Sequence, residues 1–335
     1  MKKGAKIFIS IIASLLVIIL LAGLIYYCFP WNREFFNNAK KEFVIPGLDT
    51  KFTPQGMSKL ANSNDYIISG YMSDGAPSRF YLVDGEKNEI KKYFTLEING
   101  KNYNEHAGGV VSYGATLWTV SSNEQGGFAY RFMLEDVKNV DNGGVVSIKD
   151  YFNTNNTADC VFAHDGFLYV GEFYLKDKYE TEQNHHLKTP AGEENRAMIF
   201  AYQISETNKY GLVDVKPDKA ISVGKKCQGI AISSEGNFVV STSYGLSDST
   251  IYVYKDILNI ESVDKYRVGL NEVPLYYLDS STLISSKTVP AMSEEIVINN
   301  DIVYILFESS ASKYKLFNRV RLDSVYSVTL DFLKK

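Results

Sequence analysis

The sequence predicts an all-β protein, a five-bladed β-propeller, preceded by one N-terminal transmembrane helix. Two observations carry this prediction: a group of short strand candidates recurs five times after residue 41, and an uncharged apolar run covers residues 7–29. The content of 24 Tyr and 19 Phe against 8 Pro also indicates a folded, β-rich body rather than a disordered chain.

The uncharged run at residues 7–29 is long enough for a membrane-spanning helix. At about 1.5 Å per residue it reaches roughly 34 Å, which exceeds the hydrocarbon core of about 30 Å. A basic tail at residues 1–6 precedes it, and a polar and aromatic stalk at residues 30–41 follows. Tyr26, Tyr27 and Trp31 would lie at the membrane interface as an aromatic belt. The membrane, contacted through residues 7–29, is therefore an expected partner.

Other interpretations of this run fit less well. A cleaved signal peptide usually has an apolar run of roughly 7 to 15 residues and a small-residue cleavage site. A lipoprotein needs small residues before its cysteine, but two tyrosines precede Cys28. A buried core helix of this length is rarely apolar on every side. Basic residues flank both ends of the run, and we favour a cytoplasmic N-terminus with residues 42–335 outside the cell membrane, as a single-pass signal anchor.

The charge of residues 42–335 argues against nucleic acid as a partner. This part carries 29 Lys and Arg against 38 Asp and Glu, a net charge of about −9. The count leaves out six basic residues and Glu34, which lie before residue 42. An acidic surface without basic clusters repels phosphates. Cys160 and Cys227 are its two cysteines, too few for a disulfide framework, although the two could form one bond.

The segment Lys225–Asp256 shows the repeat most clearly. Apolar and β-branched runs alternate with turns rich in Gly, Ser, Asn and Asp, which is typical of a meander of antiparallel strands. Comparable units begin 52, 52, 69 and 66 residues apart when they are aligned on Gly56, Gly108, Cys160, Gly229 and Glu295. Such recurrence of β-meanders is typical of a propeller, and the glycines would allow close packing at its axis.

A fourth strand candidate follows the first four units. These candidates are Lys91–Ile98, Gly144–Phe152, Lys219–Val223 and Thr282–Val289. The last unit lacks one because the sequence ends, whereas the segment Phe43–Leu48 has no unit of its own. We therefore expect Phe43–Leu48 to complete the fifth blade and close the ring, which would also cover two open sheet edges.

Two other architectures were weighed. Six blades of about 49 residues would also account for residues 42–335, but the surplus strand candidate near Val273–Asp279 is a single one, so insertions explain the excess better. A β-sandwich would leave the regular spacing of the units as a coincidence.

The topology of a propeller predicts where a site would lie. The loop that enters each inner strand and the loop between the second and third strands open on the same face, so their residues should meet at the channel mouth. The ligand-binding candidates there are Gln55, Tyr71, His106, Asp159, Gln228 and Tyr244. The catalytic candidates are His106, Glu172, Glu294, Glu295 and Glu308.

Each candidate also has a structural interpretation. Gln55 and Gln228 occupy the same repeat position beside glycine, where they could tie neighbouring blades together, and His106 could serve as a structural hydrogen-bonding group. Carboxylates gathered at one opening would either share protons or hold a hard cation. Asp159, Glu294 and Glu295 are the metal-ligand candidates, and Ca²⁺ is the cation expected there; no other cofactor is indicated.

The third unit contains a charged insertion at Leu175–Arg196, on the face of the predicted mouth. It is either a lid or partner-binding loop or an exposed loop without a role. The adjacent His185 and His186 within it could bind a metal, but such residues in a polar loop are more often solvated.

The sequence blocks PQGM, HAGGV, VGEF, QGIAIS, STSYGLSDSTIYVY, PAMSEEI and LFESSASKY, considered together, resemble poorly characterised membrane-anchored or secreted propeller proteins of Gram-positive bacteria. More distantly, the chain is similar to lactonase-type and quinoprotein-type propellers, whose sites also lie at the channel mouth. Their full ligand and cofactor patterns are not present here, so the resemblance implies a fold and a site location but no activity.

Two function hypotheses follow. The first is a binding module that presents its acidic mouth to an envelope ligand or protein partner. The alternative is a hydrolase acting on a lactone, ester or glycan, with His106 and glutamates at an acidic, Ca²⁺-binding mouth. The sequence contains no GxSxG, HExxH, P-loop or GxGxxG motif that would decide in favour of an enzyme.

Overall fold

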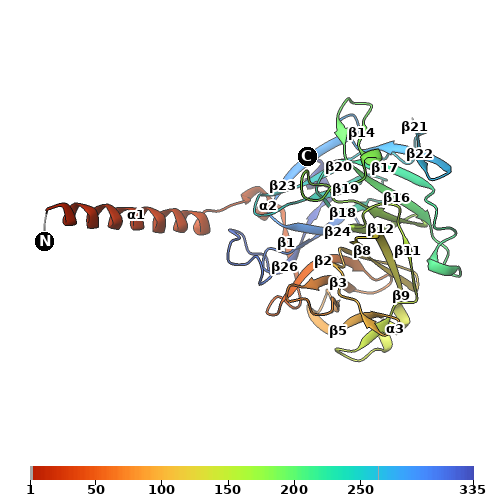
Figure 1. The fold of residues 1–335 in the computed structure, drawn as a ribbon, viewed down its shortest axis with the longest axis horizontal. Coiled ribbons are helices and arrows are strands. Elements are labelled where there is room, and N and C mark those ends of the chain that lie inside the picture. The colour runs from red at the N-terminus through yellow and green to blue at the C-terminus, as the bar shows by residue number, and fades with distance from the viewer. Residues whose placement is uncertain (1–2, 263) are drawn as a thin grey trace.

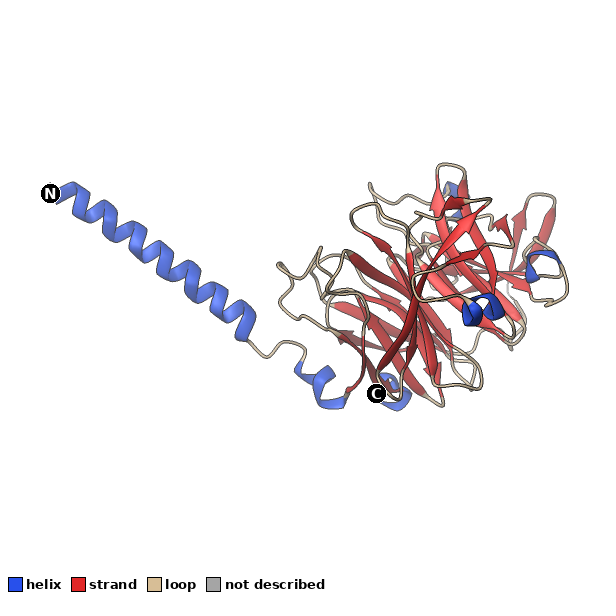
Figure 2. Cartoon of the chain, turned by 90° about the horizontal axis from the view of Figure 1, so that it is seen from below, coloured by secondary structure: helices blue, strands red, loops and turns tan. Residues whose placement is uncertain are grey.

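The computed structural model describes residues 3–262 and 264–335, and it shows five β-sheets arranged around a central axis (Figures 1 and 2). Blade 1 contains β2 (Phe52–Lys59), β3 (Asp65–Met72), β4 (Arg79–Asp84) and β5 (Glu89–Ile98); blade 2 contains β7 (Gly109–Tyr113), β8 (Thr116–Asn123), β9 (Gly126–Met133) and β11 (Asp150–Asn153). Blade 3 contains β12 (Cys160–His164), β13 (Phe167–Gly171), β16 (Ala197–Gln203) and β17 (Lys219–Val223); blade 4 contains β18 (Cys227–Ile232), β19 (Phe238–Thr242), β20 (Ser249–Tyr254) and β23 (Leu283–Val289). Blade 5 contains β24 (Ser293–Asn299), β25 (Ile302–Phe307), β26 (Ser324–Thr329) and β1 (Lys40–Val44). The predicted five-bladed propeller is confirmed.

The five inner strands form a closed ring. Strands β2, β7, β12, β18 and β24 each lie at one edge of their sheet. Each of them contacts the inner strand of the next blade, and β24 contacts β2. The unpaired backbone edges of these strands therefore line one central channel.

The ring is closed by pairing between the beginning and the end of the chain. Strand β1 is antiparallel to β26, with Lys40 opposite Ser327 and Val44 opposite Ser324. The Ile45 amide also donates to the Asp323 carbonyl at 2.9 Å. Closure by the N-terminal segment is confirmed, but the strand begins earlier than Phe43 and ends before Leu48. Pro46 has no amide hydrogen to donate and Gly47 has a φ of +73°, so the chain turns there.

One other strand prediction needs correction, and one is confirmed. The candidate Gly144–Phe152 splits in two, because β10 (Val145–Ser147) joins blade 1 in parallel with β5 while β11 joins blade 2. The surplus candidate near Val273–Asp279 is β22 (Asn271–Tyr277), which pairs with β21 (Asp264–Val268) and extends the outer edge of blade 3. The additional strands are thus insertions, as expected, and they do not form a sixth blade.

The remaining elements are short. They are α2 (Arg33–Asn38), α3 (Leu134–Asn139), α4 (Leu330–Lys334), the 3-10 turns η1 (Gln183–His185) and η2 (Lys209–Gly211), and the two-residue strands β6 (Lys101–Asn102), β14 (Leu187–Lys188) and β15 (Glu194–Asn195). Helix α2 contributes Phe35, a fully buried side chain, to the core of blade 5. Part of the predicted stalk is therefore packed against the propeller.

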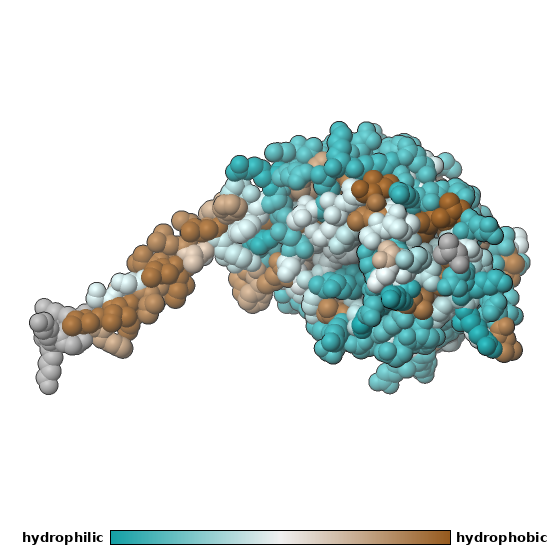
Figure 3. Space-filling view, turned by 90° about the horizontal axis from the view of Figure 1, so that it is seen from above, coloured by the Kyte–Doolittle hydropathy of each residue, from teal (hydrophilic) through white to brown (hydrophobic). Residues whose placement is uncertain are grey.

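Helix α1 (Lys3–Cys28) projects from the propeller and is long and apolar enough to cross a membrane. Figure 3 shows it as a largely brown, apolar rod beside a mainly hydrophilic body. Its large apolar side chains are exposed to solvent from Ile7 to Ile25. The predicted basic tail lies outside the residues whose side chains the structure describes.

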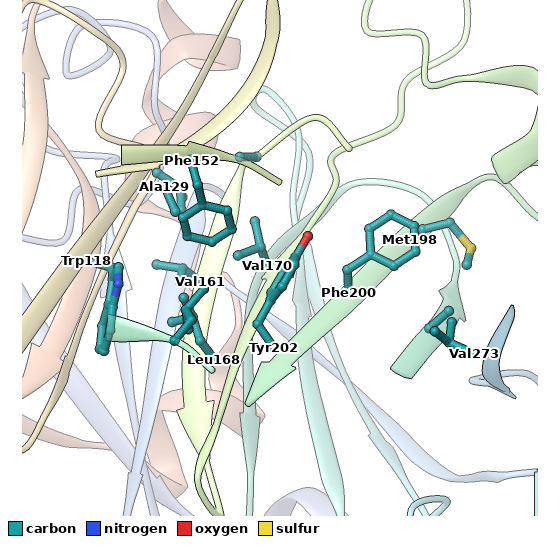
Figure 4. Packing of buried hydrophobic residues seen from close by; sticks show 14 of the residues in the cluster. Trp118, Ala129, Phe152, Val161, Leu168, Val170, Met198, Phe200, Tyr202 and Val273 are labelled. Atoms are coloured by element: carbon teal, nitrogen blue, oxygen red, sulfur yellow. The ribbon is translucent and has the colours of Figure 1, made fainter. Parts of the chain in front are cut away.

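Aromatic and aliphatic side chains fill the spaces between blades. Between blades 2 and 3, Trp118, Phe152, Leu168 and Tyr202 pack together (Figure 4). The Trp118 indole N–H donates to the Tyr210 carbonyl at 2.9 Å, so this buried polar group has a partner. The large number of Tyr and Phe residues in the sequence therefore reflects packing between sheets.

The closure of the ring predicts a sharp contrast between two neighbouring residues of β1. Phe43 is 1% exposed within the core of blades 5 and 1, whereas Val44 is 40% exposed. Phe43→Ala should lower the free energy of unfolding by about 3–5 kcal/mol through lost burial and a cavity. Val44→Ala, the matched control, should cost less than about 1 kcal/mol. Chemical denaturation followed by fluorescence measures both, and equal effects would contradict closure by β1.

Candidate functional site

Glycines at the repeat positions let the inner strands approach closely. A Cβ atom on Gly56 would lie 2.5 Å from the Val110 amide nitrogen, and one on Gly229 would lie 2.7 Å from the Glu295 Cα atom. Neither distance can accommodate a side chain. The close packing expected from these glycines is present at the axis.

A chain of hydrogen bonds joins blades 5, 1 and 2 at the channel mouth. The pairing of β2 with β3 shifts register between Pro54 and Gly56, at Gln55. Because of this irregularity, the side chain of Gln55 does not follow the regular alternation of the strand. Its amide nitrogen donates to Glu308 at 3.0 Å, and its amide oxygen lies 2.7 Å from Nε2 of His106. Since a carboxylate accepts hydrogen bonds, Gln55 must accept from His106, which leaves Nδ1 as the acceptor atom of a neutral imidazole.

The protonation of His106 agrees with this network. His106 is exposed at the mouth, with one face of its ring covered by Tyr71. Desolvation, together with the positive charge of Lys313, lowers the pKa of His106 to about 4. The ring is therefore neutral at pH 7.

Glu294 and Glu308, both from blade 5, are hydrogen-bonded to each other and share a proton. Desolvation raises the pKa of Glu294 well above its ordinary value, and the charge of Glu308 adds to the shift. Desolvation also raises the pKa of Glu308, to about 7, although hydrogen bonds from Gln55 and Glu294 and the charge of Lys313 oppose this. The two carboxyls therefore titrate as a pair and keep a proton to a higher pH than an ordinary glutamate does.

Aromatic rings cover this network. Tyr71 stacks on His106 with ring centroids 4.7 Å apart. The Tyr71 hydroxyl accepts a hydrogen bond from Lys313 at 2.8 Å and lies 3.2 Å from the Tyr314 hydroxyl. Lys313 and Tyr314 belong to the loop between β25 and β26, so blade 5 supplies both carboxyls and part of their cover.

A second group lies on the side of blades 3 and 4. Tyr244 accepts a hydrogen bond from Lys178 at 2.5 Å and packs near Phe173 and Tyr179. Asp159 accepts from the Phe173 amide at 2.9 Å, and desolvation raises the pKa of this carboxyl to about 6. Gln228 is half-buried at the entry to blade 4.

Two predicted site residues point elsewhere. Glu172 is completely buried; it contacts His185 at 2.8 Å and accepts hydrogen bonds from the amides of Thr157 and Met198. Glu295 extends into the channel beyond the mouth, where it lines a cavity of about 440 Å³ bounded by all five inner strands. Desolvation raises the pKa of Glu295 well above its ordinary value.

The insertion Leu175–Arg196 is partly anchored rather than free. The expectation that both histidines are solvated is wrong for His185, which is 1% exposed, because Glu172 provides its partner. His186 is half-buried and lies within hydrogen-bonding distance of Thr181. The exposed part, which includes Lys178 and Tyr179, overlies the mouth beside Tyr244.

The described part of the chain contains no cluster of metal-ligating side chains at the predicted metal site. Among residues 3–262 and 264–335, no group of three His, Cys, Asp or Glu residues is placed to hold a metal ion. Asp159 faces the Phe173 amide, Glu294 faces Glu308, and Glu295 faces the channel. Ca²⁺ binding by these three residues stays a prediction.

Sequence reasoning missed Lys313, Tyr314 and Phe173 at the mouth, whereas Lys178 lies in the insertion Leu175–Arg196 that it placed on this face. The available signal was the length of the segment between β25 and β26, which is far longer than the turn between β24 and β25. A long connection on the face of the mouth brings additional side chains to the site.

Comparison with known proteins places the chain within the propeller architecture. No family model matches the sequence, and no curated protein matches it. Among solved structures, the chain is similar to RS223-β-xylosidase, with 10% identity, a TM-score of 0.50, and 87% of this chain and 94% of that chain covered. It is also similar to the PQQ-bound aldose sugar dehydrogenase of Streptomyces coelicolor, with 10% identity and a TM-score of 0.48. That match covers 87% of this chain and 98% of the dehydrogenase. A GH43_1 enzyme from Xanthomonas citri shows 10% identity and a TM-score of 0.47, and the match covers 89% of this chain and 92% of that enzyme.

The resemblance to lactonase-type and quinoprotein-type propellers stays a prediction. At this level of identity the similarities to solved structures show the fold alone and say nothing of the activity of this chain. Membership of the Gram-positive group stays a prediction. The fold and the site together define a five-bladed propeller with an acidic mouth rimmed by aromatic side chains.

The shared proton predicts a specific pH dependence of stability. A folded-state pKa of about 7 for Glu308, against an ordinary value of 4.5, means that the native state binds more protons than the unfolded state between these values. This contribution is present below about pH 4.5 and is lost as the pH rises through 7. Wild type should therefore lose stability relative to Glu308→Gln between pH 5.5 and 8, by on the order of 2 kcal/mol.

Chemical denaturation at several pH values measures this difference. Desolvation of His106 acts in the opposite direction below pH 6.5, but the comparison with Glu308→Gln largely cancels it because both proteins contain His106. Exposed Glu261 provides the matched control: Glu261→Gln should follow wild type at every pH. A pH-independent difference between wild type and Glu308→Gln would contradict the shared proton.

Proposed function

We propose that the chain is a membrane-anchored, extracytoplasmic binding module that holds a polar, hydroxyl-rich ligand, such as a glycan of the cell envelope, at the channel mouth. The observation that carries this proposal is the continuous network of Glu294, Glu308, Gln55 and His106 beneath Tyr71. It is supported by helix α1, which is long and apolar enough to serve as a membrane anchor.

The chemistry of the mouth suits hydroxyl groups. A hydroxyl both donates and accepts, and the mouth offers acceptors at Glu308 and at Nδ1 of His106. Tyr71 and Tyr314 add aromatic faces with a polar tip, which suit a ligand that is apolar on one face and polar at its edges. Pockets that combine aromatic walls with a few placed polar groups are typical of small-molecule sites.

The direct contact between the two carboxyls favours binding over glycoside hydrolysis. Catalytic carboxyls of glycosidases stand roughly 5 to 9.5 Å apart, so that the scissile bond and a water molecule fit between them. Glu294 and Glu308 instead hydrogen-bond to each other. In this arrangement Glu294 is buried, and the half-buried Glu308 is the carboxyl that a ligand can reach.

Ligand binding should depend on Gln55, which connects Glu308 with His106. We expect Gln55→Leu to weaken binding at least about tenfold, because it removes the hydrogen bonds that hold Glu308 and His106 in position at the mouth. The measurement is isothermal titration of full-length chain in nanodiscs with fragments of peptidoglycan and neutral glycans. Gln203→Leu, at an exposed position at the end of β16, is the matched control. A ligand whose affinity is the same for Gln55→Leu and wild type would contradict a site at this mouth.

A hydrolase of lactones, esters or glycans remains the second candidate, and one observation favours it. The Glu308 pKa of about 7 matches the requirement for a general acid or base that works near neutral pH. The same titrations, analysed for products by chromatography, separate the two functions. Product formation that is abolished in Glu308→Gln would establish the enzyme, whereas binding without turnover supports the module.

A further inference from the structure

The loop between β25 and β26, residues 308–323, lies against the end of helix α1. The Tyr27 hydroxyl donates to the Leu316 carbonyl at 2.8 Å, and the Tyr26 hydroxyl donates to the Phe317 carbonyl at 3.1 Å. The Arg319 guanidinium lies 4.1 Å from the centre of the Trp31 ring. Figures 1 and 2 show this loop projecting from the propeller on the side of α1. The contacts place the loop beside the end of α1 that is nearest to the propeller.

The tip of this loop exposes two large apolar side chains. Leu316 is 69% exposed and Phe317 is 61% exposed, and the two are adjacent in the sequence. Their backbone carbonyls bond to the tyrosines of α1, so their position is set by the helix end. Aromatic and apolar side chains at the end of a membrane-spanning helix are suited to the interfacial region of a bilayer.

The exposed charges of this loop are mainly positive, whereas residues 42–335 as a whole carry a net negative charge. Lys315 and Arg321 are exposed, and Arg321 lies 5.0 Å from the centre of the Tyr27 ring. The two acidic residues of the loop are both engaged: Glu308 faces the mouth, and Asp323 forms an ion pair with Lys41 at 2.8 Å. Basic residues next to an apolar tip complement an anionic lipid surface.

We propose that the 308–323 loop is a second membrane contact, in which Leu316 and Phe317 enter the interface of the bilayer that α1 crosses and Lys315 and Arg321 bind anionic headgroups. Lys313 and Tyr314 of the same loop cover the channel mouth. The contact therefore holds the mouth beside the membrane surface, where it meets ligands carried by lipids or by the adjacent envelope. This inference rests on the membrane anchoring proposed above, but not on the ligand class.

Depth-dependent quenching tests the insertion of the apolar tip. Full-length chain with Cys28→Ser and Leu316→Cys is labelled with an environment-sensitive fluorophore, while Cys160 and Cys227 are buried. It is reconstituted in nanodiscs that contain phosphatidylglycerol and a lipid spin-labelled on its acyl chain. Leu270→Cys is the matched control, because Leu270 is 92% exposed at the tip of the β21–β22 hairpin, on the side of the propeller away from α1 in Figure 1. We expect at least about threefold more quenching at position 316 than at position 270. Equal quenching at the two positions would overturn the proposal.

The role of the basic residues is tested in the same assay. Lys315→Glu combined with Arg321→Glu should reduce quenching at position 316 in phosphatidylglycerol nanodiscs, but not in nanodiscs of phosphatidylcholine alone. Thermal unfolding of each labelled protein verifies that the propeller is intact. Quenching that is insensitive to both charge reversal and lipid charge would overturn the headgroup contact.

Discussion

The structure depends on backbone pairing between two segments that lie almost 300 residues apart, β1 and β26. The sheet of blade 5 gains its fourth and outermost strand from β1, because the residues after β26 form helix α4 instead. Because β1 provides it, the edge of β26 is covered and blade 5 is held beside blade 1. Loop closure over so long a separation costs entropy, which the buried side chains of Phe35 and Phe43 help to offset.

The channel mouth is a consequence of this closure. Gln55 comes from blade 1, His106 from the entry to blade 2, and Glu294 and Glu308 from blade 5, so their network crosses the junction that β1 secures. An open ring would separate Gln55 from Glu308. The low polarity of the closed ring also explains why the two glutamates share a proton and why His106 stays neutral.

Periodic features of the sequence allowed the fold to be predicted, whereas the site depended on side-chain direction. The regular spacing of the repeat units and the glycines at their starts reflect local backbone constraints. This pattern predicted the number of blades. Topology then placed Gln55, Tyr71, His106, Glu294 and Glu308 on one face, where the structure brings them together. It could not show that Glu172 turns inward to His185 or that Glu295 extends along the channel, since the direction of a side chain depends on tertiary packing that the repeat pattern does not encode. The parallel pairing of β10 and β22 at outer edges was also beyond prediction, because sheet edges carry no periodic signal of their own.

The central claim, that the N-terminal strand closes the ring, is tested most directly by hydrogen exchange measured by mass spectrometry. Peptides covering residues 40–46 should exchange as slowly as those covering β24 and β25, because their amides open only when the propeller unfolds globally. Rapid exchange in residues 40–46, with β24 and β25 still protected, would show that the ring is closed in some other way.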